Sequence, residues 1–201
     1  MNDKFQNKYR ISSTRLQNWD YGWNAPYFVT ICTKKREHYF GRIVNGEMQL
    51  SEIGGIAEQF CHEIPDHFPF VILDAFVIMP NHVHGIIVIN KTDDGRYVGG
   101  GGDGGDDDGG NVVETQNFAS LRQTRQQLHP KNKFGPQRKN LASIIRGYKT
   151  GVKKYATMNN IDFAWQPRFN DHIIRDNQSF DRIRNYINNN IKNWENDDFY
   201  K

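Results

Sequence analysis

Two histidines separated by one apolar residue are the residues of this chain best suited to chemistry. His82 and His84 lie in the segment Met79-Pro80-Asn81-His82-Val83-His84-Gly85. If this segment is extended, both imidazoles project from one face, because side chains alternate along a strand. Two neutral imidazoles aimed at one point hold a divalent metal ion, but a third ligand from elsewhere is normally required. The alternative, a satisfied core histidine with an incidental neighbour, stays open on this pattern alone.

Strand-like runs flank the histidine pair and must position it. Residues 71–78 and 85–89 are rich in β-branched and apolar side chains, and Met79-Pro80-Asn81 between them is typical of a tight turn. The pattern predicts two neighbouring strands with the histidines at the start of the second.

Hydrophobic periodicity predicts the remaining elements. We expect a strand over residues 27–33, a hairpin over 40–50 that turns at Asn45-Gly46, and a helix from Ser51 to about residue 63. A second helix is expected over 141–158, although Gly147 and Gly151 weaken it. The last helix has the clearest apolar stripe, made of Phe180, Ile183, Ile187, Ile191 and Trp194. This order predicts an α+β fold, an antiparallel sheet covered by helices and related to the ferredoxin-like plan.

The composition indicates one domain with a biased insert. The chain has 201 residues and a net charge of +3, which fits a loose arm over residues 1–22 and a single domain over 23–201. Residues 92–111, rich in glycine and aspartate, are expected to be disordered, with a flexible basic continuation to about residue 137. Without the acidic insert the body is basic, which suits a polyanionic ligand or is simply a solvated surface.

Cysteine usage and the N-terminus predict the compartment. Cys32 and Cys61 are too few and too isolated for a disulfide framework or a structural zinc site. Residues 1–10 contain no apolar signal region, and no apolar run approaches the length of a membrane span. We therefore expect a cytoplasmic protein.

Two residues on the last predicted helix can complete a metal site. Tyr186 and Asn190 are four positions apart and therefore share a helix face, beside the apolar stripe. With His82, His84 and the Asn190 amide oxygen around an ion, Tyr186 would lie one turn away. A divalent ion beside a phosphodiester stabilises an in-line displacement. A phenol, with a pKa of about 10, attacks only when that environment or a base removes its proton. A tyrosine at the margin of a stripe is otherwise an ordinary packing residue.

Basic residues mark a candidate DNA-binding surface. Three cations at i, i+3 and i+7 form one stripe on the helix over 141–158, and two more flank a histidine. The candidate DNA-binding residues are Arg146, Lys149, Lys153, Arg168, His172 and Arg175.

Four segments together resemble the single-tyrosine HUH transposases, in particular the branch of REP-associated tyrosine transposases. They are residues 27–30 with 40–41, residues 77–85, residues 165–169 with 172–175, and residues 186–190. The resemblance implies an HUH endonuclease sandwich in which His82, His84 and Asn190 bind Mg²⁺ or Mn²⁺ and Tyr186 is the nucleophile. It also implies a single-stranded DNA substrate with an imperfect REP-like hairpin, cut beside the stem to leave a 5′-phosphotyrosine.

The chain departs from this family pattern at two places. Ile191 stands where many relatives have a proline after the asparagine, and Phe169-Asn170 stands where many have a second tyrosine. The second departure removes one competing nucleophile, but Tyr148 and Tyr155 remain rivals of Tyr186.

Two other functions remain open. One is a non-catalytic single-stranded nucleic-acid-binding module derived from such a transposase. The other is a metal-dependent hydrolase that uses His82, His84 and His172 without a covalent intermediate. A monomer and a homodimer are both compatible with the sequence, so the tyrosine would serve its own or a partner's histidines.

Overall fold

A four-stranded antiparallel sheet forms the centre of the structure, a computed structural model that describes residues 4–5, 8–9, 16, 19–91 and 138–200. The expected insert and its continuation to residue 137 lie outside these ranges. The strands run in the order β6-β7-β3-β8. They are β3 (Ala25–Cys32), β6 (Val71–Met79), β7 (His82–Ile89) and β8 (Asn170–Ile173).

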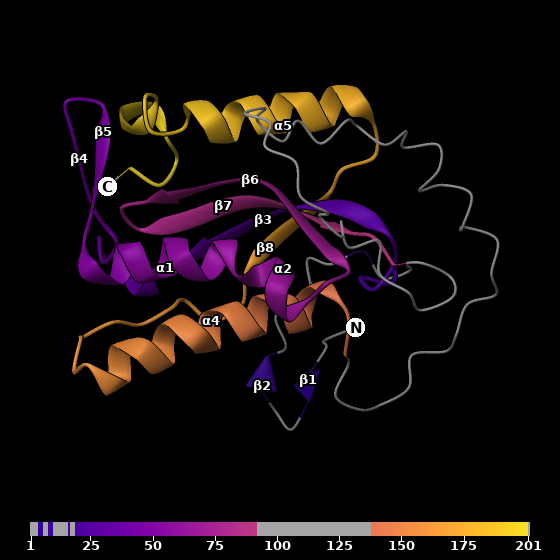
Figure 1. Ribbon diagram of the computed structural model, residues 1–201, viewed down its shortest axis with the longest axis horizontal. Helices are drawn as coiled ribbons and strands as arrows, with labels where there is room; N and C mark the ends of the chain where they lie inside the picture. The colour runs from indigo at the N-terminus through magenta and orange to yellow at the C-terminus, as the bar shows by residue number, and fades with distance from the viewer. Residues whose placement is uncertain (1–3, 6–7, 10–15, 17–18, 92–137, 201) are drawn as a thin grey trace, which may run out of the picture.

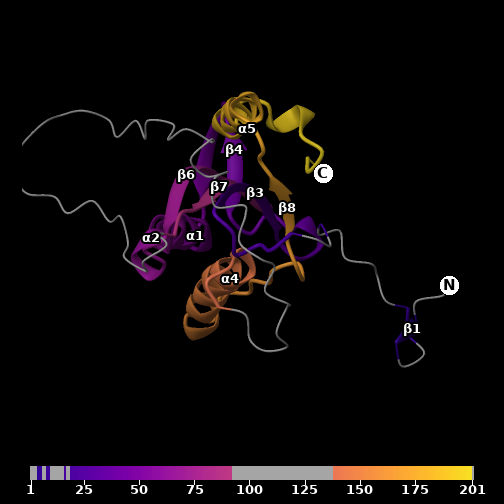
Figure 2. The ribbon, with the colours of Figure 1, turned by 90° about the vertical axis from the view of Figure 1, so that its right-hand side faces the viewer.

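Helices cover both faces of this sheet (Figures 1 and 2). On one face lie α1 (Glu52–His62), α2 (Ile64–His67) and α4 (Leu141–Met158), and on the other lies α5 (Asn177–Asn189). The sequence of elements β3-α1-β6-β7-α4-β8 and their strand order are those of a ferredoxin-like β-α-β-β-α-β unit. The predicted α+β fold, an antiparallel sheet covered by helices, is confirmed.

Short strand pairs accompany the main sheet. Strands β4 (Gly41–Val44) and β5 (Glu47–Leu50) form the predicted hairpin. Asn45 and Gly46 both have positive φ, 54° and 76°, as a two-residue type I′ turn requires. Within the expected N-terminal arm, β1 (Lys4–Phe5) pairs with β2 (Lys8–Tyr9). Trp19 and Tyr21, near the end of the same expected arm, pack against the core.

Two apolar layers hold the helices to the sheet. The larger lies on the side of α1, α2 and α4 and is built from alternate strand residues such as Tyr27, Val29 and Ile31. The smaller lies under α5 and contains Phe180 and Ile187. Both cysteines are free and buried.

Helix α4 is continuous through both glycines that weakened its prediction. A Cβ at Gly151 would lie 3.0 Å from the ring of Phe60 on α1, and one at Gly147 would lie 3.3 Å from Phe68. The glycines therefore permit close packing against the neighbouring helix, and this tertiary contact outweighs their low helix propensity.

Helix α5 is shorter than its apolar stripe predicts, so the expectation of one helix reaching Trp194 is wrong. It ends at Asn189, with Asn190 as its C-cap, and the 3₁₀ turn η3 (Trp194–Asn196) follows. The run of asparagines at its end has poor helix propensity, because the short amide competes for backbone hydrogen bonds. The stripe continues across the break, with Trp194 buried, and the chain turns back towards the sheet.

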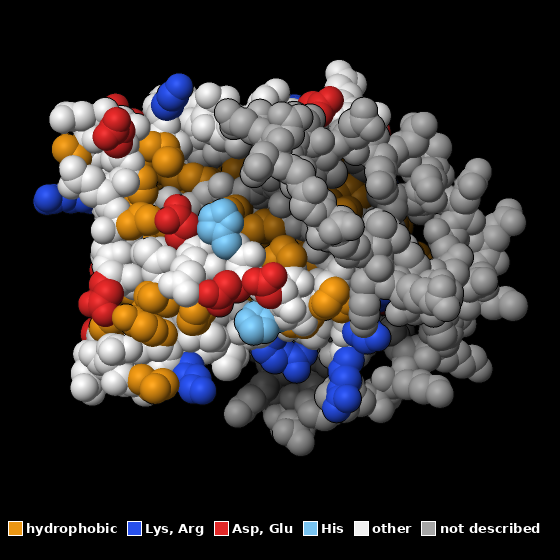
Figure 3. Space-filling model, viewed as in Figure 1, with side chains coloured by type: hydrophobic (Ala, Val, Ile, Leu, Met, Phe, Trp, Pro, Cys, Tyr) orange, Lys and Arg blue, Asp and Glu red, His pale blue; other side chains and the backbone are white. Residues whose placement is uncertain are grey.

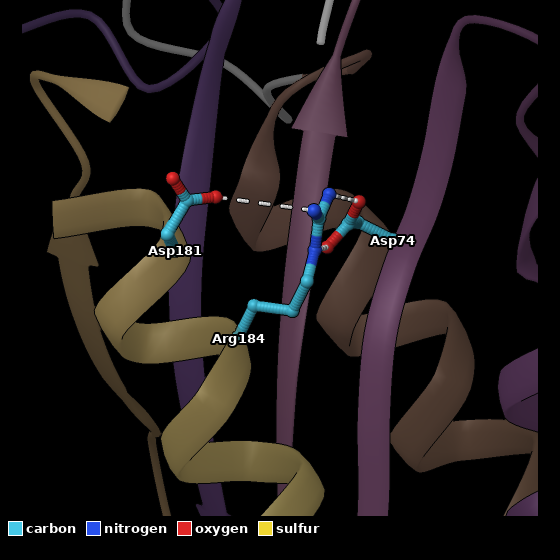
Figure 4. A network of polar contacts seen from close by, with 3 residues as sticks. All are labelled: Asp74, Asp181 and Arg184. Atoms are coloured by element: carbon cyan, nitrogen blue, oxygen red, sulfur yellow. Dashed lines mark hydrogen bonds and ion pairs between the residues drawn. The ribbon is translucent and has the colours of Figure 1, made fainter. Parts of the chain in front are cut away.

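An irregularity in β6 connects α5 to the sheet. The register with β7 shifts between Leu73 and Phe76, so the strand contains a bulge. A bulge turns two consecutive side chains to one face: Asp74 and Ala75 both face α5. The Asp74 carboxylate accepts two hydrogen bonds from the Arg184 guanidinium, one of them 2.9 Å from Nε (Figure 4). Helix α5 is thus fixed to the strand that precedes the histidines.

Candidate metal centre and nucleophile

Strand β7 places the two histidines side by side. His82 and His84 project from the sheet face that α5 covers, and their ring centroids are 4.4 Å apart. Their side chains are 0% and 2% exposed. The shared face predicted from their spacing is therefore present, and both imidazoles are buried.

Neighbouring side chains orient both rings. Nδ1 of His82 lies 2.8 Å from the Asn81 amide oxygen, and Nδ1 of His84 lies 2.9 Å from the Thr30 hydroxyl. An Nδ1–H that donates to such an oxygen leaves the Nε2 lone pair available for a metal ion. The Nε2 atom of His82 is buried and has no hydrogen-bond partner among the described residues.

Both imidazoles are neutral at physiological pH. Burial lowers the pKa of His82 to about 2, helped by the adjacent His84, and burial lowers the pKa of His84 to about 4. A neutral imidazole is the form that binds metal ions.

Tyr186 and Asn190 lie on the same face of α5, as their spacing predicts, and reach this site. The Tyr186 hydroxyl lies 3.2 Å from Nε2 of His84 in the same chain. The Asn190 side chain is 1% exposed, and its amide oxygen has no hydrogen-bond partner within the described part of the chain. The four residues singled out from sequence therefore meet at one place.

Asp197 is a member of the site that the sequence did not reveal. The carboxylate Oδ2 accepts hydrogen bonds from the Tyr186 hydroxyl at 3.1 Å and from the Asn190 amide at 3.0 Å. One ligand atom from each of His82, His84 and Asp197 lies within 4.8 Å of the others. Asp197 reaches the histidines only because the chain turns back after α5, and no sequence spacing predicts that return.

The donor set fits a divalent cation. Two neutral imidazoles, an aspartate and an orphaned amide oxygen combine nitrogen and oxygen donors in a buried place, which suits borderline and hard ions. Buried polar atoms without partners are rare and costly, so a cation that accepts their lone pairs accounts for both orphaned atoms.

The Tyr186 phenol is protonated in this arrangement. Burial raises its pKa to about 12, assisted by the charge and hydrogen bond of Asp197. At the same time its side chain is 42% exposed. The residue is therefore partly exposed while its hydroxyl lies beside His84, and the phenol requires help to lose its proton.

The candidate DNA-binding residues lie on different parts of the molecule. Arg146, Lys149, Lys153 and Arg168 line a groove of about 640 Å³ along α4. Helix α4 lies on the sheet face opposite α5, the helix that carries Tyr186 (Figure 2). Figure 3 shows basic side chains along the lower edge of this view, where α4 runs, below acidic side chains near α1 and α2. Two of the lysines also hold the segment that precedes β8. Lys149 donates to the carbonyl oxygens of Gln166 and Arg168, and Lys153 donates to that of Phe163.

The other two candidates lie at the edge of the sheet. His172 is on β8, and Arg175 follows that strand; both are exposed and line a polar pocket at the start of α5. His172 pairs with Phe28 of β3 rather than with β7. The metal-type group found among the described residues does not include it, so the geometry does not favour a three-histidine hydrolase.

The rival tyrosines belong to α4. Tyr148 is buried and donates to the Ala57 carbonyl oxygen at 3.1 Å, and Tyr155 donates to Glu52 at 3.0 Å. Both contacts are with α1, across the sheet from the histidines. Tyr186 is therefore the tyrosine that the fold brings to the candidate metal centre.

The fold and the site together define an α+β protein with a ferredoxin-like sheet and a His-x-His centre faced by a tyrosine helix. No protein-family model matches the chain. An uncharacterised protein of Haemophilus influenzae is 38% identical over 189 residues, which cover 94% of this chain and 92% of that protein. The chain belongs to the same family as this protein.

Two solved structures are similar to the chain at low sequence identity. One is a REP-associated tyrosine transposase bound to a REP hairpin, with a TM-score of 0.49 and 16% identity over 90% of this chain and 72% of that one. The other, a candidate transposase of Deinococcus radiodurans, has a TM-score of 0.35 and 11% identity, covering 88% and 97% of the two chains. Within the described residues, no helix is long and apolar enough to cross a membrane.

Proposed function

We propose that this protein is a metal-dependent single-stranded DNA endonuclease and strand transferase, of the kind formed by REP-associated tyrosine transposases. Its substrate would be DNA beside a short imperfect hairpin. The observation that carries the proposal is the Tyr186 hydroxyl, 3.2 Å from Nε2 of His84 at a site with two orphaned metal-type donors. A module that only binds DNA needs none of these groups.

The residues of the site would have separate roles in cleavage. His82, His84, Asn190 and Asp197 would hold Mg²⁺ or Mn²⁺, which supplies Lewis-acid stabilisation of charge on the phosphodiester. The Tyr186 oxygen forms a bond to phosphorus while the bond from phosphorus to the 3′-oxygen breaks. Asp197, already the acceptor of the Tyr186 hydrogen bond, takes the phenol proton, and the departing 3′-oxygen takes a proton from water. The products are a 5′-phosphotyrosine and a 3′-hydroxyl.

The high pKa of Tyr186 supports the metal requirement. A phenol with a pKa of about 12 is a poor nucleophile at neutral pH, so a cation beside it is needed to favour the phenolate. Full cleavage in EDTA would contradict the proposal.

The DNA-binding part of the proposal uses both groups of candidate residues. Arg146, Lys149, Lys153 and Arg168 would contact phosphates along α4, and His172 and Arg175 would contact them near the β8 edge. Each lost phosphate contact should reduce the salt slope of log affinity by about 0.7 for single strands and about 0.9 for duplex. Charge reversal along α4 without any change in that slope would refute this placement.

Trapping a covalent adduct tests the central claim. The protein is incubated with Mn²⁺ and labelled hairpin oligonucleotides of randomised stem sequence, and denaturation-resistant adducts are mapped by mass spectrometry. We expect the label on Tyr186 and no adduct with Tyr186→Phe, while Tyr148→Phe and Tyr155→Phe still form it. His82→Ala or His84→Ala should abolish cleavage but preserve DNA binding.

The matched phenylalanine variants make the result specific. Tyr186→Phe removes one partly exposed hydroxyl and keeps the ring, so the free energy of unfolding should change by less than about 1.5 kcal/mol. An adduct on Tyr148 or Tyr155 would overturn the assignment. Binding of DNA with no adduct under any metal would instead support a non-catalytic module.

A further inference from the structure

A cationic loop lies against the turn that carries the histidines. Strand β3 ends at Cys32, and the loop η1 (Lys34–Arg36) follows. The buried Thr33 hydroxyl lies 2.9 Å from the Asn81 carbonyl oxygen and 2.7 Å from the Glu37 carbonyl oxygen. The loop is therefore held beside His82, at the end of the sheet where the candidate metal centre lies.

Two successive residues of this loop adopt the left-handed conformation. The φ angles are 55° at Lys35 and 58° at Arg36, a region that costs free energy for residues other than glycine. Backbone hydrogen bonds from Arg36 to Thr33 and from Glu37 to Lys34, each 3.2 Å, close the turn. Such conformations persist where the surrounding structure enforces them and are common at binding sites.

A stack of side chains connects Arg36 to His82. The Arg36 guanidinium lies 4.7 Å from the centre of the Phe199 ring, and that ring lies 4.5 Å from the His82 ring. Nη1 donates to the Asp198 carbonyl oxygen at 3.0 Å, so the planar group is oriented. Within the described residues this bond uses one of its five N–H donors.

An open hollow adjoins these cations. It encloses about 790 Å³ and is lined by Lys35, Arg36, Glu37, His38 and Gln166. Its two permanent cations outnumber its one carboxylate. A guanidinium fork beside an ammonium is an arrangement that recognises phosphate oxygens.

We propose that Lys35 and Arg36 bind the DNA phosphate next to the one that is cleaved. The inference rests on the proposed function and adds to it a phosphate site on a loop that no motif indicates. A strand whose scissile phosphate lies at His82 and His84 must place a neighbouring phosphate close by, and the loop presents its cations there. The two contacts position the strand and take no part in bond breaking.

The salt dependence of DNA binding tests this site without any metal chemistry. Fluorescence anisotropy in EDTA measures the affinity of the intact protein for oligothymidine of about 12 nucleotides, from about 50 mM to about 500 mM salt. Arg36→Gln and Lys35→Gln should each reduce the slope of log affinity by about 0.7. The ratio of the wild-type affinity to that of either variant should then fall about fivefold across this tenfold range of salt.

Two control variants separate phosphate binding from a general charge effect. Arg36→Lys keeps a cation in the loop and should retain most of the slope. Arg42→Gln removes the same charge from an exposed position of β4, where Arg42 bonds Gln49, and should leave the slope unchanged. If Arg36→Gln and Lys35→Gln both keep the wild-type slope, the inference is overturned while the proposed function stands. If the wild-type protein does not bind the oligonucleotide, both are overturned. A protein that binds with the expected slopes but does not cleave DNA would contradict the proposed function and not the phosphate contacts.

Discussion

Deleting Asp74 and deleting Arg184, which form an ion pair, should destabilise the protein by different amounts. The Asp74 side chain is 6% exposed and that of Arg184 is 29% exposed. Removing the arginine leaves a nearly buried carboxylate without its partner, whereas removing the aspartate leaves a guanidinium that can rotate into the solvent. Fully buried pairs lose about 3–5 kcal/mol when one partner is deleted, and exposed pairs lose at most about 1 kcal/mol.

From these exposures we expect Arg184→Met to lower the free energy of unfolding by about 3 kcal/mol and Asp74→Asn by about 1–2 kcal/mol. For a domain of this size, 3 kcal/mol corresponds to a fall in Tm of about 6–12 °C. Urea unfolding of the metal-free protein measures both values. The weaker ion pair of Arg184 with Asp181, at 4.0 Å, should contribute little, so Asp181→Asn is the matched control.

A double-mutant cycle completes this test. Combining Asp74→Asn with Arg184→Met leaves no unpaired charge, so the cost of the double variant should be smaller than that of Arg184→Met alone. If the two single costs simply add, or if Arg184→Met costs less than about 0.5 kcal/mol, the pair is not the attachment that its geometry indicates.

Two further outcomes are expected. In EDTA the free energy of unfolding should fall as the pH drops from about 6.5 towards 4, because His82 and His84 take up protons only after unfolding; each contributes up to about 1.4 kcal/mol per pH unit. Urea titrations of a variant with both histidines replaced by glutamine should show a flatter profile, and an equally steep one would refute this. Deleting residues 93–108 should change the free energy of unfolding by less than about 0.6 kcal/mol, since loop closure depends weakly on length, and should preserve adduct formation. A deletion variant that folds but does not cleave would give the segment a role in catalysis.

Sequence reasoning succeeded where a local pattern determines the outcome. The His-x-His alternation needs only an extended backbone, and β7 provides it. The Asn45-Gly46 dipeptide needs only a two-residue turn, and the i, i+4 spacing of Tyr186 and Asn190 needs only helical geometry. The order of these elements was sufficient to predict the α+β fold.

What the sequence did not reveal depends on contacts between distant segments. Asp197 joins the site because the chain reverses after α5. Asp74 reaches Arg184 because of a bulge in β6 that no residue type predicts. The α4 stripe was predicted as a face, but its position across the sheet from Tyr186 follows from topology. Phe199 is a further case, since it stacks on His82 from the end of the chain.

The position of Tyr186 depends on more than the apolar face of its helix. That face is narrow, and Phe180 and Ile187 are its buried members, so apolar packing alone leaves the helix free to slide or rotate by small amounts. Arg184 fixes the side towards β6, while Asp197 bonds the Tyr186 hydroxyl on the side of the histidines. These polar contacts on both sides have directional geometry that apolar burial lacks, and together they set the distance between the phenol and His84. The same helix that supplies the nucleophile is therefore positioned by groups outside the recognisable motif.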